Sequence, residues 1–65
     1  MTIRDYVKKN FKDAGENDIT SSIEMSLKNK EEETLPGLGV LFETLWENSS
    51  KEDQMKMSNI IAKNI

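Results

Sequence analysis

Charged side chains are the main chemical resource of this 65-residue sequence, because it contains neither cysteine nor histidine. That absence excludes disulfides, thiol nucleophiles, imidazole bases and zinc-finger spacing. Glu43 and Glu47 lie one helical turn apart, and they could act as an acid–base pair only if burial or a partner separated their pKa values. The surrounding apolar pattern places both on an exposed helix face, where they are surface charges. We therefore expect a protein that is not an enzyme.

A second acidic pattern spans residues 13–24, the length of an EF-hand calcium loop, with Asp13 first and Glu24 last. Calcium loops require an oxygen ligand at position three and glycine at position six, whereas this sequence has Gly15 and Asp18 there. The polar residues of this segment are better explained as helix caps. The sequence thus predicts no metal site, and nothing in it predicts a cofactor.

The amino-terminal part carries the only cationic cluster, which consists of Arg4, Lys8, Lys9 and Lys12. Lysines late in a helix complement its dipole, so this cluster can be a solvated helix face. The alternative hypothesis is a small regulatory or nucleic-acid-associated helical protein that uses these four residues, with Tyr6 and Phe11 beside them. The net charge of −3 and the sequence pI near 4.8 disfavour binding of a polyanion. Nucleic acid is therefore not the expected partner.

The segment from Leu35 to Trp46 is expected to organise the rest of the chain, because it holds the only proline, two of the three glycines and the only tryptophan. Its apolar residues recur at i, i+3, i+4 and i+7 and predict a helix with a core face, which Trp46 extends: Leu38, Leu41, Phe42 and Leu45. Residues 35–38 fit a type II turn, because proline presets φ and glycine tolerates a positive φ. We expect this turn to launch a buried central helix.

Two residues of this helix do not fit a simple amphipathic pattern. Gly39 costs about 1 kcal/mol relative to alanine inside a helix, which suggests that a backbone or a ring approaches closely there. Val40 lies off the apolar stripe and is a candidate exposed contact. The alternative is that Gly39 belongs to the turn and that Val40 is an ordinary surface residue. Under the first hypothesis, an unidentified protein partner or a second copy binds a face with these candidate residues: Pro36, Gly37, Gly39, Val40 and Trp46.

The same segment carries a family resemblance. The run Leu-Pro-Gly-Leu-Gly-Val-Leu-Phe-Glu at residues 35–43, followed by Leu-Trp-Glu-Asn at residues 45–48, resembles the signature of the small acid-soluble spore protein I family of endospore-forming bacteria. The resemblance is strongest over residues 32–50, and the chain length also fits. It implies a minor protein that is made in the forespore and retained in the spore core. It implies neither a chemical mechanism nor any binding or catalytic residues.

Start and stop signals predict two helices before the central segment. Thr2 and Asp5 resemble a capping box for a helix that runs to about residue 13, with Gly15 as the C′ residue after it. Asn17 or Asp18 caps a second helix that continues to about residue 30. Ile3, Val7 and Phe11 mark the apolar face of the first helix, and Ile19, Ile23 and Leu27 that of the second.

A fourth helix is predicted after the central segment. Ser49 and Glu52 have the spacing of a capping box, and the apolar side of the helix carries Met57, Ile60, Ile61 and Ile65. The short Asn-Ser-Ser connection favours an antiparallel hairpin with the central helix. The methionines are expected to fill gaps against Trp46 and Phe42, or, if exposed, to form an adaptable groove for a partner.

Length bounds the architecture. A chain of 65 residues makes one domain, residues 1–65, and buries only about 60% of its unfolded surface, so marginal stability is expected. We predict an all-α fold, a small bundle of about four short helices, to which self-association could add the missing burial.

The hydropathy pattern indicates where in the cell the protein is expected. The amino terminus lacks the apolar core of a signal peptide, and no stretch approaches the roughly 18 apolar residues of a membrane span. The sequence predicts no membrane association and a cytoplasmic location, which in a sporulating cell includes the forespore and the spore core.

Overall fold

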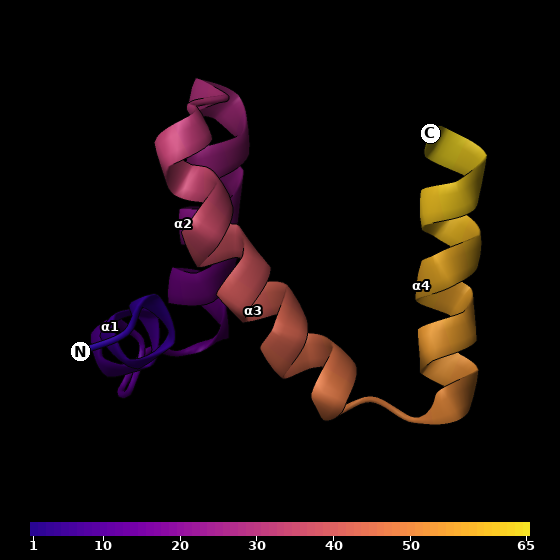
Figure 1. The fold of residues 1–65 in the computed structure, drawn as a ribbon, viewed down its shortest axis with the longest axis horizontal. Coiled ribbons are helices and arrows are strands. Elements are labelled where there is room, and N and C mark those ends of the chain that lie inside the picture. The colour runs from indigo at the N-terminus through magenta and orange to yellow at the C-terminus, as the bar shows by residue number, and fades with distance from the viewer.

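The computed structural model describes residues 1–65, and its regular structure is entirely helical (Figure 1). The α-helices are α1 (Ile3–Asn10), α2 (Glu16–Asn29), α3 (Leu35–Glu47) and α4 (Lys51–Asn64), and one 3₁₀ turn, η1 (Glu32–Thr34), precedes α3. Both α1 and α2 contact α3, whereas α4 stands apart beyond the loop that follows α3 (Figure 1). The prediction of an all-α fold with about four short helices is confirmed.

The start of α1 follows the sequence prediction, but its end does not. The Asp5 N–H donates to Thr2 Oγ1 at 3.1 Å, and the Thr2 N–H donates to Asp5 Oδ2 at 3.5 Å, which closes the predicted capping box. The helix ends at Asn10, because the chain tightens into bonds between residues three apart, such as Lys12 N–H to the Lys9 carbonyl at 3.4 Å. The prediction that this helix continues to about residue 13 is wrong.

The predicted caps between α1 and α2 are also wrong. Gly15 is not the C′ residue of α1 but the N-cap of α2, with an extended backbone at φ −87°. Asp18 is the third residue of α2, and its Oδ2 accepts the Gly15 N–H at 3.2 Å. An acidic side chain in the first helical turn satisfies a free backbone donor and complements the dipole, so Asp18 stabilises the helix start without being the cap.

The predicted type II turn at residues 35–38 is absent, because these residues form the first turn of α3. Pro36 fits there, since its missing N–H needs no partner in the first turn and its φ of about −65° is already helical. Gly37 has no positive φ. A proline φ near −60° suits both a type II turn and a helix start, so the sequence motif did not distinguish them.

The buried core lies between α1 and α3 and is small. Val7, at 8% exposure, and Val40, at 6%, are the only buried residues. Both line a small cavity of about 200 Å³ with Phe11, Ile19 and Leu41. The stripe predicted as the core face of α3 (Leu38, Leu41, Phe42 and Leu45) contains no buried residue, so that prediction is wrong. The reason is that α1 docks on Val40 at the edge of this stripe, so it reaches Leu41 but leaves Phe42 and Leu45 exposed.

α4 begins one residue later than predicted. Ser50, not Ser49, is the cap, and its Oγ accepts the Asp53 N–H at 3.1 Å. The chain direction reverses between α3 and α4, as a hairpin requires, but the two helices diverge instead of packing along their length (Figure 1).

The apolar side chains of α4 form no core. No residue of α4 is buried, so the expectation that its methionines fill a core against Phe42 and Trp46 is wrong within this chain. Gln54 Nε2 donates to the Trp46 carbonyl at 2.8 Å and holds the corner between the two helices.

Candidate functional site

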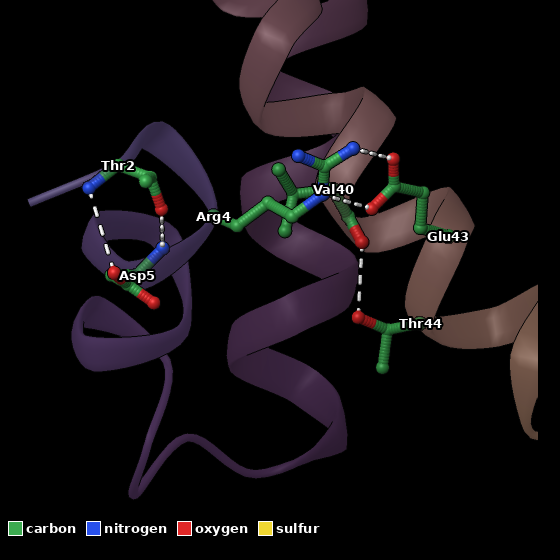
Figure 2. A network of polar contacts seen from close by, with 6 residues as sticks. All are labelled: Thr2, Arg4, Asp5, Val40, Glu43 and Thr44. Atoms are coloured by element: carbon green, nitrogen blue, oxygen red, sulfur yellow. Dashed lines mark hydrogen bonds and ion pairs between the residues drawn. The ribbon is translucent and has the colours of Figure 1, made fainter.

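Arg4 and Glu43 connect α1 to α3, although 39 residues separate them in the sequence (Figure 2). Arg4 Nε donates to Glu43 Oε2 and Arg4 Nη2 donates to Glu43 Oε1, both at 2.7 Å, so the pair is bidentate. Their side chains are 63% and 42% exposed, and solvent therefore screens the attraction. The main effect of the pair is geometric, because a planar fork fixes which side of α3 faces α1.

The ion pair also decides what Glu43 can do chemically. The hydrogen bonds from Arg4 lower the pKa of Glu43, desolvation opposes this effect, and the charges of Arg4 and Lys8 lower the pKa further. The same hydrogen bonds raise the pKa of Arg4, with Glu47 adding to the effect. A general acid needs a raised pKa near the working pH, so the environment of Glu43 is the opposite of what a catalytic acid requires.

Val40 is not the exposed contact that its position off the apolar stripe suggested. It lies one turn before Thr44 on the side of α3 that faces α1, and its side chain is 6% exposed. Thr44 Oγ1 donates to the Val40 carbonyl at 2.9 Å (Figure 2). Val40 is thus a core residue, and both sequence-based alternatives, exposed contact and ordinary surface residue, are wrong.

One of the four residues of the basic cluster is engaged in an ion pair within the chain. Arg4 is paired with Glu43, whereas Lys8, Lys9 and Lys12 form no ion pair, although the charge of Lys8 helps to lower the pKa of Glu43. The nucleic-acid hypothesis for Arg4, Lys8, Lys9 and Lys12 stays a prediction. A salt-titrated binding assay with duplex and single-stranded DNA tests it, because phosphate contacts weaken steeply with added salt.

The strongest apolar stripe of α3 lines an open groove against α2. This α2–α3 groove has a volume of about 430 Å³ and is lined by Ile19, Ile23, Leu38, Leu41, Phe42, Thr44 and Leu45. Phe42 is 42% exposed and Leu45 is 53% exposed, so the groove is not filled by the chain itself. The sequence pattern identified the apolar residues on both walls but assigned them to a closed core, since periodicity does not show whether a facing element arrives.

The remaining candidate residues lie around this stripe. Gly39 has no atom within 4 Å of the position where a Cβ would stand, so the expected close approach at Gly39 does not occur within this chain. The Trp46 ring lies 5.7 Å from the Phe42 ring, tilted by 37°. Pro36 and Gly37 line a separate cavity of about 520 Å³ that extends toward Tyr6 and other residues of α1. The five candidate residues therefore do not form one surface.

The structure contains no group of three or more histidine, cysteine, aspartate or glutamate side chains placed to hold a metal ion. None of its helices is both long enough and apolar enough to cross a membrane.

Comparison with known proteins gives a consistent result. The family model described as "Small, acid-soluble spore protein I" matches residues 1–65. A protein of that name from Halalkalibacterium halodurans is 29% identical over 65 residues, which cover 100% of this chain and 96% of the relative. A protein of the same name from Bacillus licheniformis is 32% identical over 57 residues, which cover 88% of this chain and 81% of the relative. Another from Bacillus velezensis is 33% identical over 57 residues, which cover 88% of this chain and 80% of the relative. No solved structure matches this chain significantly. Because the family model covers every residue, the chain belongs to the small, acid-soluble spore protein I family of spore proteins.

Proposed function

We propose that this protein is a non-enzymatic component of the forespore and later of the spore core, where residues 1–65 act as one helical domain by protein interaction or packing. The family of spore proteins to which the chain belongs supports the location. The lowered pKa of Glu43 and its pairing with Arg4 support a role without catalysis, because they fix a charge instead of providing a proton.

The observation that carries the proposal is the open α2–α3 groove. Six of its seven lining residues are apolar, and Phe42 and Leu45 keep about half of their surface exposed. Grooves of this kind between helices accept an amphipathic helix whose apolar residues repeat at i, i+3 or i+4 and i+7. The proposed ligand is therefore an amphipathic helix of a protein chain.

The partner-binding residues proposed on α3 are Gly39 and Trp46, which do not line the groove themselves but lie on the side of α3 next to its lining residue Phe42. These three residues follow one another at i, i+3 and i+7 and share one side of the helix. The open space at Gly39 leaves room for a partner backbone to approach α3 closely. Val40 belongs to the core instead, and Pro36 and Gly37 lie on the side toward α1.

A photo-crosslinking residue placed in the groove tests the proposal in developing spores. The groove position is Leu45, and the matched control is Lys9, which lies on α1 outside the groove. We expect protein adducts at Leu45 that are absent at Lys9, with mass spectrometry mapping them to a helical segment of the partner. Equal yields at both positions, or no adduct at Leu45, would contradict a function based on this groove.

A further inference from the structure

We infer that the helix which fills the α2–α3 groove is α4 of a second copy of this chain, so that two chains exchange their α4 helices and complete each other's bundle. The inference rests on the proposed function, because it names the partner of the same groove. Five observations carry it: the state of α4, the dimensions of the groove, the exposed area, the distribution of charge and the corner between α3 and α4.

α4 has the sequence of a packed helix but no partner in its own chain. Met57, Ile61 and Ile65 lie at i, i+4 and i+8 on one side, and Ile61 and Ile65 are 44% and 101% exposed. An unpacked helix of 14 residues is marginal in water, and pairs such as Glu52–Lys56 at 3.7 Å add only a few tenths of a kcal/mol. The helix therefore needs a surface that covers this stripe.

The groove matches that stripe in length and chemistry. Its apolar wall on α3 extends from Leu38 to Leu45, roughly 10 Å along the helix, and the α4 stripe from Met57 to Ile65 extends roughly 12 Å. Isoleucine, leucine and phenylalanine line the groove, while isoleucine and the flexible side chain of methionine form the stripe. Such surfaces exclude water well when they meet.

The exposed area exceeds that of a compact monomer by about the amount that a dimer buries. The chain exposes 5809 Å², whereas a compact protein of 7.5 kDa exposes roughly 4,200 Å². The excess of roughly 1,600 Å² per chain falls within the roughly 1,000–2,500 Å² that each subunit of an obligate homodimer buries. The radius of gyration agrees, at 12.7 Å against about 10.7 Å expected for 65 compact residues.

Charge favours α4 of a second copy as the occupant. Helix α2, which forms one wall of the groove, contains three acidic residues and one lysine, whereas α4 contains three lysines and two acidic residues. Both acidic residues of α4 lie in its first turn, so Lys56 and Lys63 are the charges beside the apolar stripe. A basic helix against an acidic wall lowers the repulsion between two copies of a negatively charged chain.

The corner between α3 and α4 directs α4 away from its own groove. Asn48 Nδ2 donates to the Thr44 carbonyl and Gln54 Nε2 donates to the Trp46 carbonyl, both at 2.8 Å. With these bonds in place α4 leaves α3 at a divergent angle (Figure 1), so a second chain can receive it more easily than its own chain.

Oligomeric state and site-specific crosslinking test the exchange, since the chain has no native cysteine. Light scattering should give twice the monomer mass of 7.5 kDa. A mixture of Ile61→Cys and an affinity-tagged Leu45→Cys variant, treated with a bismaleimide, should give a mixed dimer. A mixture of Lys9→Cys with the tagged Leu45→Cys variant should not.

Ile61→Asp should raise the dissociation constant of the dimer by roughly tenfold or more, because it places a charge in the apolar stripe of α4. Asn59→Asp adds the same charge to the opposite side of α4 and should not raise the dissociation constant.

Three results would overturn the inference. The first is a monomeric mass together with crosslinking only inside an Ile61→Cys/Leu45→Cys double variant. This result would show that α4 fills the groove of its own chain, and it would also contradict the proposal that a partner protein binds there. A monomeric mass without crosslinking would leave the groove free, and adducts to a different protein in spores would then keep the proposed function alone. A dimer in which Ile61→Cys links only to itself would contradict docking in the groove. Circular dichroism of each variant verifies that its helices are retained.

Discussion

α1 and α4 both neighbour the central helix, yet only the shorter one is docked. α1 has eight residues and brings Val7 and Arg4 to α3, where Val40 and Glu43 receive them. α4 has fourteen residues, a serine cap and an apolar stripe, but it meets α3 only at the corner. Helix length and caps therefore do not decide docking in this chain. A complementary surface on α3 decides it, and that surface faces α1.

The largest expected effect on stability distinguishes the core between α1 and α3 from the exposed helix α4. Val40→Ala removes two methyl groups from the core between α1 and α3 and should lower the free energy of unfolding by about 2 kcal/mol. Ile60→Ala, the matched control on α4, removes a side chain that is 62% exposed and should change it by less than about 0.5 kcal/mol. Urea titration followed by circular dichroism at low protein concentration measures both. Equal losses would show that α4 is as well packed as α1.

The caps of the two helices give the next effect. Thr2→Ala and Ser50→Ala each remove a side-chain acceptor at a helix start and should cost about 1 kcal/mol of local stability. The loss at Thr2 should lower the unfolding midpoint of the whole α1–α3 unit, because α1 is docked. The loss at Ser50 should reduce the helix content of α4 and leave that midpoint unchanged. Backbone chemical shifts report both, and a common shift of the midpoint would count against the comparison.

Substitutions of Gly39 test whether the side of α3 that α1 does not cover is free in the isolated chain. Gly39→Ala meets no atom within 4 Å and no positive φ, so it should stabilise the helix by about 0.4–1 kcal/mol in the isolated chain. Gly39→Leu should disturb association more than folding, because the bulk enters space that a partner would use. Thermal unfolding and light scattering separate the two effects. A destabilising Gly39→Ala would indicate a close neighbour that the fold does not show.

The smallest effect is expected from the ion pair that orients α1. The pKa of Glu43 is lowered in the folded chain, so its contribution to stability is present above the pKa of an unfolded glutamate, about 4.3, and is lost as pH falls through the folded value. The raised pKa of Arg4 removes stability only in strong alkali. Glu43→Gln should therefore be less stable than the parent at neutral pH, by less than Val40→Ala, and the difference should shrink in acid. A difference that stays constant with pH would rule out this role for the pair.

Local signals in the sequence predicted the helices well. The capping box at Thr2 and the apolar stripe that contains Val7 are both present as expected. The start of α4 was misplaced by one residue, because Ser49 and Ser50 each precede an acidic residue by three positions and only one of them caps. Proline at position 36 was equally compatible with a turn and with a helix start.

Long-range packing was not predictable from the same signals. Periodicity selects the stripe with the most apolar residues, and on that basis Phe42 and Leu45 were expected to be buried. The structure buries Val40 instead, because α1 docks on that side of α3, where Val7 packs in the core and Arg4 pairs with Glu43. Sequence periodicity cannot show that two charged residues 39 positions apart pair with each other. Which side of α3 is covered and which side lines the open groove is therefore known only from the structure.

Amide hydrogen exchange measured at several protein concentrations tests the central claim most directly. The amides of α3 around Val40 should be protected at every concentration, because their packing lies within one chain. The amides of α4 around Ile61 should exchange rapidly in dilute solution and become protected as the concentration rises and a second chain covers the helix. Strong protection of α4 that does not depend on concentration would contradict the account, since it would show that the chain covers this helix by itself.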